Sequence, residues 1–313
     1  MRVMLALLAM LLCACGGGGA RHNHLVFAGV PKMTNNPVFE VAHRGAEQAC
    51  KELGVELRWD GPTRGDAMQQ ANIVRAFIDQ RVDGLLISVN NADVLRSAID
   101  EAVDAHIPVV IFDSDAPRSK RFTFYGVFDE EAGGKGGELL LQAMGKRGKV
   151  AILHGTQGAT NLEARIRGFR AYVSEHAPEV QCLEPVFCDD NIAKAVEVMK
   201  TTIQAHPDLT GFYLSGGWPL FAPAPGPFEG LEPGKIKVVA FDALPQQLDY
   251  VRQGYVQALT GQKLFEWGAE SVKMLKQYLD GKRDFPAKIN SGFDVVTKDN
   301  VEQYAAAKAR FFQ

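Results

Sequence analysis

Residues 108–113 of the chain read PVVIFD, an apolar run that ends on an aspartate, and residues 237–242 read KVVAFD. A short apolar run that stops at a polar residue is typical of a buried strand in a parallel sheet. Ligands of open α/β sheets bind beyond the carboxyl ends of the strands. The two segments therefore predict two similar halves, in which Asp113 and Asp242 each offer one carboxylate to a shared site.

Two further pairs of segments keep nearly the same separation. Residues 26–29 (VFAG) match 151–155 (AILHG), and residues 83–88 (DGLLIS) match 210–215 (TGFYLS). The separations run from 126 residues (29 to 155) to 129 residues (113 to 242). Three matching strands in the same order predict a duplicated α/β unit. The alternative is that the buried strands of all parallel sheets resemble one another.

Length and composition limit the classes of protein to consider. The chain has 313 residues, of which 46% are apolar and 23% charged, and its formal net charge is −3. This length allows two domains of ordinary size. No basic patch rich in aromatic residues is present, so a nucleic-acid partner is not expected. The histidines are scattered, so we also expect no metal site.

Known motifs for cofactors and catalysis are missing from the sequence. No G-x-G-x-x-G follows the first predicted strand, and neither a Walker motif nor a nucleophile-elbow motif is present. We therefore expect no cofactor and no enzymatic activity. A pair of carboxylates can perform glycoside hydrolysis, which keeps a glycosidase as an alternative.

The first 23 residues form a separate segment. Arg2 gives a short basic start, and residues 4–12 are apolar, which is typical of a signal peptide and too short to span a bilayer. Residues 12–15 (LCAC) resemble a bacterial lipobox. The resemblance implies cleavage before Cys15, lipidation of Cys15 and a flexible glycine tether after it. The expected location is the periplasm or cell surface, with a lipid anchor; the alternative is a secreted protein cleaved nearby.

Strands and helices are expected to alternate after this segment, which predicts parallel sheets with right-handed crossovers. Asn36 and Pro37 mark the start of the first helix. A Pro- and Gly-rich loop over the site is expected at 218–234. Cys182 and Cys188 flank one predicted strand, and six extended residues separate them too far for a disulfide. The main predicted strands are 25–29, 55–59, 84–89, 108–113, 122–127, 149–153, 180–187, 211–214, 236–241 and 255–259.

Several motifs together resemble one family. They are Asn35-Asn36-Pro37, Asp113-Ser114-Asp115, residues 165–169 (RIRGF), Phe241-Asp242 and Gln262. From about residue 24 to the end, the chain resembles the type I periplasmic sugar-binding proteins of bacterial ABC importers, the ribose-binding-protein-like group. Residues 61–63 (GPT) and 215–221 (SGGWPLF) resemble a branch that includes rhamnose- and autoinducer-2-type binders.

The resemblance implies an α/β fold of two Rossmann-like parallel-sheet lobes joined by a three-stranded hinge. It implies a first lobe of residues 24–129 plus 263–290 and a second lobe of 130–262 plus 291–313. The chain would cross between the lobes near Asp129, Gly261 and Ser291.

The resemblance also implies a set of ligand-binding residues. Carboxylates accept hydrogen bonds from sugar hydroxyls, arginine donates in a fixed fork, and aromatic rings cover the apolar faces of the sugar. Ser114 stands where some pentose binders have arginine, and Ser215 where relatives often have asparagine, so the sugar need not be ribose. The expected ligand-binding residues are Asn36, Phe39, Asp113, Ser114, Arg165, Ser215, Trp218, Asp242 and Gln262.

Structural roles remain open as alternatives for several of these residues. Either aspartate can cap the turn or helix that follows its strand. Arg165 can be a surface residue of its helix, and Phe39 can belong to the core. For Trp218, a role in ligand binding and a role in the core both remain open.

The function that the resemblance implies is capture of a monosaccharide or related polyol by closure of the hinge, followed by delivery to an ABC permease. The expected contact with a membrane is the lipid anchor alone. One alternative is a sensor of the same fold that reports a sugar or an autoinducer-like signal to a membrane receptor. A sugar-responsive repressor shares the fold, but the sequence has an export signal and no DNA-binding headpiece.

Overall fold

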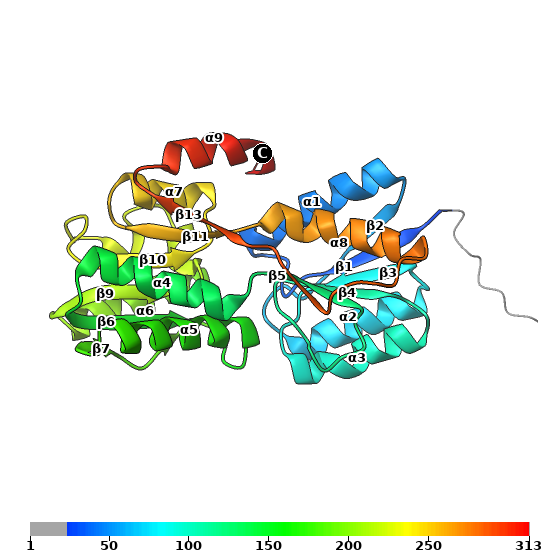
Figure 1. Cartoon of the computed structure of the whole chain (residues 1–313), viewed down its shortest axis with the longest axis horizontal. Helices are drawn as coiled ribbons and strands as arrows, with labels where there is room; N and C mark the ends of the chain where they lie inside the picture. Colours follow the sequence, from blue (N-terminus) through cyan, green and yellow to red (C-terminus); the bar gives the residue numbers. More distant parts are fainter. Residues whose placement is uncertain (1–23, 313) are drawn as a thin grey trace, which may run out of the picture.

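The computed structural model describes residues 24–312 and shows two α/β lobes side by side (Figure 1). Cys15 and the predicted leader and tether, residues 1–23, lie outside the described residues. Within residues 24–312, no helix combines the length and apolar character needed to cross a membrane.

The first lobe is built on a six-stranded parallel sheet in the order β12-β5-β4-β3-β1-β2. Its strands are β1 (Val26–Val30), β2 (Glu56–Trp59), β3 (Gly84–Ile87), β4 (Val109–Phe112), β5 (Thr123–Gly126) and β12 (Lys288–Asn290). Its helices are α1 (Pro37–Leu53), α2 (Ala67–Asp79), α3 (Ala92–Asp104) and α8 (Leu264–Leu279).

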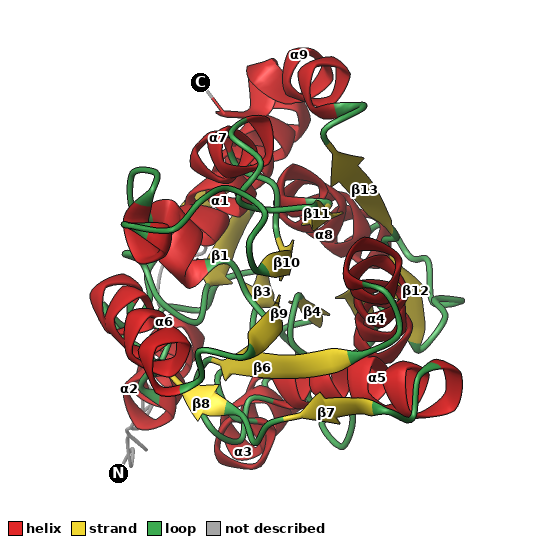
Figure 2. Ribbon diagram, turned by 90° about the vertical axis from the view of Figure 1, so that its left-hand side faces the viewer, coloured by secondary structure: helices red, strands yellow, loops and turns green. Residues whose placement is uncertain are grey.

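The second lobe has a sheet in the order β13-β11-β10-β9-β6-β7 (Figure 2). Among the described strands of this sheet, only β13 is antiparallel to its neighbour. Its strands are β6 (Gly148–His154), β7 (Val180–Cys182), β8 (Val186–Phe187), β9 (Leu209–Leu214), β10 (Lys237–Phe241), β11 (Ala258–Gln262) and β13 (Phe293–Thr297). The short strand β8 also pairs with β6. Its helices are α4 (Asp129–Met144), α5 (Thr160–His176), α6 (Ile192–Ala205), α7 (Pro245–Arg252) and α9 (Val301–Phe312), with short 3₁₀ turns η1 (Trp218–Phe221) and η2 (Gly226–Phe228).

The two sheets repeat one topology. The order β2-β1-β3-β4-β5 in the first lobe corresponds to β7-β6-β9-β10-β11 in the second. The pairs β1 and β6, β3 and β9, and β4 and β10 are the segments whose sequences match. The predicted duplication is therefore confirmed.

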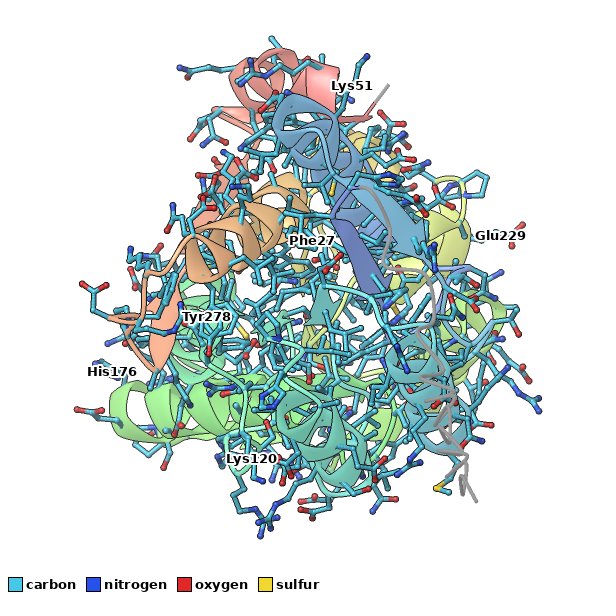
Figure 3. All side chains as sticks on the ribbon, turned by 90° about the vertical axis from the view of Figure 1, so that its right-hand side faces the viewer. Phe27, Lys51, Lys120, His176, Glu229 and Tyr278 are labelled. Atoms are coloured by element: carbon cyan, nitrogen blue, oxygen red, sulfur yellow. The ribbon has the colours of Figure 1, made fainter. Side chains whose placement is uncertain are left out.

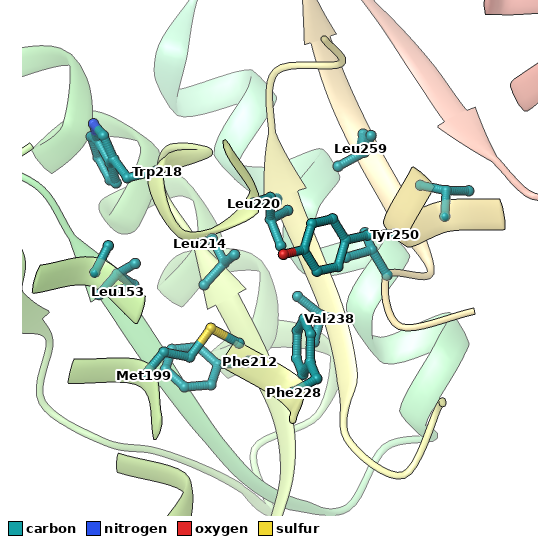
Figure 4. Packing of buried hydrophobic residues seen from close by; sticks show 14 of the residues in the cluster. Leu153, Met199, Phe212, Leu214, Trp218, Leu220, Phe228, Val238, Tyr250 and Leu259 are labelled. Atoms are coloured by element: carbon teal, nitrogen blue, oxygen red, sulfur yellow. The ribbon is translucent and has the colours of Figure 1, made fainter. Parts of the chain in front are cut away.

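Each sheet is covered by apolar side chains on both faces. In the first lobe, α1 and α8 pack on one face, and α2 and α3 on the other. In the second lobe, α6 and α7 cover one face, and α4 and α5 the other. Phe27 of β1 lies in the interior, whereas Lys51 and Lys120 project from the surface (Figure 3). Tyr250 and Phe228 gather around Val238 of β10 in the second lobe (Figure 4).

The ends of α1 follow the capping rules on which the prediction rested. The side chain of Asn36 accepts a hydrogen bond from the Val38 N–H at 3.0 Å, and Pro37 occupies the first turn. Gly54 ends the helix with a left-handed φ of 67°, a conformation that glycine adopts without steric cost.

Two predicted strands are wrong in detail. The strand predicted over 180–187 is broken, because β7 ends at Cys182 and β8 begins at Val186. The strand predicted over 255–259 begins three residues later, at Ala258. The reason is that the Tyr255 and Val256 N–H groups close the end of α7 by donating to the Tyr250 carbonyl oxygen. Cys50, Cys182 and Cys188 are free thiols.

The chain passes between the two sheets at three places: at residues 127–128 after β5, at Lys263 after β11, and at residues 291–292 between β12 and β13. All three connections are short. They bring the carboxyl ends of the parallel strands of both sheets toward one another (Figure 1).

Candidate ligand-binding site between the lobes

A cavity that is partly open to solvent lies where the two sheets face one another. Of the predicted site residues, seven line the cavity: Asn36, Phe39, Asp113, Arg165, Trp218, Asp242 and Gln262. Eight further residues complete the wall: Lys32, Met33, Val38, Asn161, Leu162, Asp190, Gly216 and Phe221.

The two strand-end carboxylates are buried and held by side chains. One oxygen of Asp113 accepts a hydrogen bond from the Ser88 hydroxyl at 2.6 Å, and the other accepts one from the Asn161 amide at 3.3 Å. One oxygen of Asp242 accepts from the Gln262 amide at 2.7 Å. Neither aspartate is a helix N-cap in the described chain, and α7 is instead preceded by Leu244 at that position.

Arg165 is a buried residue of α5 rather than a surface one, with 3% of its area exposed. Its guanidinium donates to Asp129 Oδ1 at 2.8 Å, to the Ser215 carbonyl oxygen at 3.0 Å and to Gln262 Oε1 at 2.8 Å. Its central carbon lies 4.0 Å from the centre of the Phe241 ring. These contacts fix the plane of the guanidinium, and two of its five N–H groups remain available to a ligand.

Burial shapes the electrostatics of this cluster. Burial raises the pKa of Asp129 to about 6, although the neighbouring Arg165 acts in the opposite direction. Burial likewise raises the pKa of Asp242 and of Asp190. For Arg165, burial alone would lower the pKa, but Asp129, Asp113 and Asp242 raise it overall. The arginine therefore stays charged, and the carboxylates around it together balance its positive charge.

Three polar residues of the wall were not predicted: Lys32, Asn161 and Asp190. Lys32 follows β1, and Asp190 follows β8, so the strand-end rule that found Asp113 also applies to them. Asn161 lies in the first turn of α5, and its sequence context carries no comparable signal. Lys32 Nζ donates to Asn161 Oδ1 at 3.0 Å and lies 3.8 Å from Asp113 Oδ2. Asn161 of the second lobe therefore contacts two buried residues of the first.

The apolar part of the wall comes from both lobes. Phe39 of α1 is 4% exposed and packs edge-on against Phe112, so it belongs to the core as well as to the cavity. Trp218 lies at one edge of the second-lobe core (Figure 4). A Cβ atom at Gly216 would lie 2.4 Å from the indole, and one at Gly155 would lie 2.7 Å from it. Glycine at both positions leaves the space in which this ring sits.

The structure does not bring Ser114 and Ser215 to the cavity wall. Ser114 is buried, and its backbone N–H and C=O pair with Phe112 and Val89. Ser215 contributes its carbonyl oxygen to Arg165 instead of its side chain to the cavity. Within residues 24–312, no cluster of three or more His, Cys, Asp or Glu residues is arranged to hold a metal ion.

Two mostly parallel α/β lobes around a polar cavity define a two-lobed ligand-binding protein. Residues 27–283 match the model of the periplasmic binding protein domain, and the chain belongs to this family. It is a family of extracytoplasmic binding proteins, not of enzymes.

Curated relatives extend over most of the chain. The ribose import binding protein of Escherichia coli is 28% identical over 261 residues, which cover 81% of this chain and 84% of that protein. That of Bacillus subtilis is 26% identical over 251 residues and 80% of each chain. The xylose/arabinose-binding protein of Sulfolobus acidocaldarius is 22% identical over 299 residues, with 88% and 71% covered.

Solved structures are similar over almost the whole fold. An ABC transporter solute-binding protein from Burkholderia graminis, in complex with D-arabinose, has a TM-score of 0.84 and 32% identity, with 91% of this chain and 99% of that chain covered. One from Agrobacterium vitis, bound to α-D-tagatopyranose, has a TM-score of 0.85 and 26% identity, with 92% and 98% covered.

Proposed function

We propose that this protein captures a monosaccharide or a related polyol in the cavity between its lobes and delivers it to an ABC permease. The observation that carries the proposal is the convergence of Asp113 from one lobe and Asp242 from the other on a single cavity that also holds Arg165. A sugar presents a ring of hydroxyls and two apolar faces, and this cavity offers it acceptors, a forked donor and aromatic walls. Relatives that bind ribose, xylose or arabinose support this class of ligand.

Each side chain has a distinct role in this proposal. Asp113, Asp242 and Asp190 accept hydrogen bonds from ligand hydroxyls, and Arg165 and Lys32 donate to ligand oxygens. The oxygen of the Asn36 amide is engaged in capping α1, which leaves its N–H₂ group as the donor. Gln262 bridges Arg165 and Asp242 and so orients both of them. Phe39 and Trp218 cover the faces of the ring, while Ser215 acts through Arg165 and Ser114 stays behind the wall.

The charges of the cavity favour an uncharged ligand. Asp113, Asp190 and Asp242 line it together with two cations, Lys32 and Arg165. Asp129, which is bonded to Arg165, adds a fourth carboxyl group. An anionic sugar would add a further negative charge to a site whose carboxylates already outnumber its cations. We therefore expect neutral sugars to bind in preference to sugar acids or sugar phosphates.

Closure of the two lobes completes the site. We assign the first lobe to residues 24–129 plus 263–290 and the second to 130–262 plus 291–313, with bending at the three short connections. Asn161 links the lobes through its contacts with Lys32 and Asp113, so these contacts form only when the cleft is closed. A ligand that bridges the same two surfaces shifts the equilibrium toward the closed form, which is the form the permease recognises.

We also propose that the mature protein is anchored to the membrane by lipid on Cys15. The support is the apolar run at residues 4–12 followed by LCAC at 12–15. Cys15→Ser should abolish the incorporation of labelled palmitate and move the protein from the membrane fraction to the soluble fraction. A Cys15→Ser protein that still partitions with the membrane contradicts the anchor.

The test of the binding function is a thermal-shift screen of the purified protein against D-ribose, D-arabinose, D-xylose, D-allose and D-tagatose. A ligand at one hundred times its dissociation constant adds about 2.7 kcal/mol of stability, which raises Tm by a few degrees. We expect Asp242→Asn to remove the shift. Asp208→Asn is the control, because Asp208 is exposed and pairs only with Lys149 among the described ion pairs. A flat panel, or a shift that survives Asp242→Asn, overturns the proposal.

A further inference from the structure

A second cavity, also partly open to solvent, adjoins the first at the mouth of the cleft. The two cavities share five wall residues: Met33, Asn36, Asp190, Trp218 and Phe221. The remaining wall of the second cavity comes from Asn35, Arg64 and Gly65 of the first lobe and from Asp189, Asn191, Ile192 and Ala193 of the second. The shared residues place the two cavities side by side, with Asp190 and Trp218 lining both.

The second cavity repeats the chemistry of the first. Trp218 and Phe221 supply aromatic surface, Arg64 supplies a forked donor, and Asp189 and Asp190 supply acceptors. Asp189 and Asp190 have φ values of 52° and 55°, a left-handed pair that turns the chain at this point. Asp189 carries an ion pair with Lys194 at 2.5 Å. Aromatic surface beside donors and acceptors from both lobes is what a second hydroxylated ring requires.

Asp190 stands at the junction of the two cavities. Each of its carboxylate oxygens accepts one hydrogen bond from Thr156, at 3.2 and 3.1 Å. Each oxygen keeps a further lone pair for a ligand. The Asn36 amide faces the same junction from the first lobe. These two residues flank the position where a substituent on the captured sugar would leave the inner cavity.

We propose that the second cavity is a subsite for a substituent on the captured sugar, namely the second sugar unit of a disaccharide or the small polar aglycone of a glycoside. The proposal rests on the proposed function, because the first ring must occupy the inner cavity. The five shared wall residues place the outer cavity directly beside the inner one, within reach of a substituent on the captured ring. The ligand class therefore extends from free monosaccharides to their glycosides.

The test compares three kinds of ligand by isothermal titration calorimetry. They are the free monosaccharide that gives the largest shift in the five-sugar screen, its α- and β-methyl glycosides, and the disaccharides that carry that sugar at one end with glucose or galactose at the other. We expect at least one disaccharide to bind with a dissociation constant no more than tenfold above that of the free sugar.

Two variants separate the cavities. Arg64→Ala removes an exposed side chain that lines the second cavity and does not line the first. Asp189→Asn removes a charge from the same cavity and keeps a residue type that tolerates a left-handed backbone. We expect the double variant to weaken disaccharide binding about tenfold and to leave binding of the free monosaccharide within twofold.

The outcomes distinguish the subsite from the underlying function. If the free sugar binds while every glycoside and disaccharide is weakened more than tenfold, the subsite is wrong and the capture of monosaccharides stands. An equal loss of both kinds of ligand in the double variant also contradicts the subsite. If no ligand binds, free sugars included, the proposed function itself fails.

Discussion

Asp113 and Asp242 leave their strands with the same backbone conformation in two different lobes, with φ values of 59° and 68°. The N–H of each donates to the carbonyl oxygen of the neighbouring strand, to Tyr125 in one lobe and to Thr260 in the other. A left-handed conformation is unfavourable for most residues, but Asp and Asn tolerate it. The duplication has thus placed two carboxylates on one cavity by the same local geometry.

This geometry predicts a difference between two substitutions of Asp113. Asp113→Asn keeps a residue that tolerates positive φ but removes the charge, so sugar affinity should fall ten- to a hundredfold while Tm changes little. Asp113→Ala should lose a similar affinity and, in addition, about 1 kcal/mol of stability to backbone strain. Calorimetric titration and thermal unfolding of both variants measure the two effects. An Asn variant that binds like the wild type excludes Asp113 from the binding site.

Close packing of α4 on α5 holds Arg165 in place. A Cβ atom at Gly133 would lie 2.0 Å from the Arg165 carbonyl oxygen, whereas one at Gly134 would lie 3.7 Å from its nearest neighbour. Gly133→Ala should therefore cost at least about 2 kcal/mol and weaken ligand binding, because α5 must move. Gly134→Ala is the matched control and should stabilise by about 0.5–1 kcal/mol through helix propensity. Equal effects of the two substitutions on urea unfolding contradict the explanation.

The buried carboxyl of Asp129 predicts a specific dependence of stability on pH. Burial raises its pKa from 3.8 to about 6 in the folded protein, against the opposing effect of Arg165. The folded state therefore holds this proton more tightly than the unfolded chain does. The corresponding stability is fully present below about pH 4 and is lost as the pH rises through 6, by about 3 kcal/mol at most.

Urea unfolding of the wild type and of Asp129→Asn at several pH values between 4 and 7 tests this. The difference in unfolding free energy between the two proteins should change by a few kcal/mol in that interval, in the direction that favours the wild type at low pH. Burial also raises the pKa values of Asp190 and Asp242. Their contributions to the pH dependence of the unfolding free energy have the same sign in both proteins and cancel in the difference. Parallel pH profiles would show that Asp129 does not titrate in this range.

The sequence allowed the duplicated strands and the positions of Asp113 and Asp242 to be predicted, because a buried parallel strand is a continuous apolar run with a definite end. The sequence did not reveal Asn161, because the pattern around a residue in the first turn of a helix is the same whether that residue faces solvent or another lobe. Ser114 lies next to a site residue, but its side chain does not reach the cavity wall. The break between β7 and β8 depends on pairing with β6, which is a tertiary contact that local pattern does not encode.

The C-terminal helix α9 connects the two lobes. Glu302 near its start pairs with Arg252 of α7 in the second lobe. Near its end, the Phe311 ring stacks on Phe265 of α8 in the first lobe, with 4.4 Å between ring centres. Lys308 lies 3.6 Å from Glu266 of the same first-lobe helix. The end of α9 therefore helps to hold the first lobe in the position that this structure shows.

Removal of residues 307–313 should therefore shift the protein toward an open form. Because only the closed fraction binds tightly, the apparent dissociation constant should rise by the factor by which that fraction falls. Small-angle X-ray scattering should show a larger radius of gyration for the truncated protein without ligand, and the difference should shrink when saturating sugar is added. Glu302→Ala is the control, because its contact with Arg252 lies within the second lobe and its loss should leave the radius unchanged. A truncated protein with the scattering profile and the affinity of the wild type would mean that α9 does not restrain the lobes.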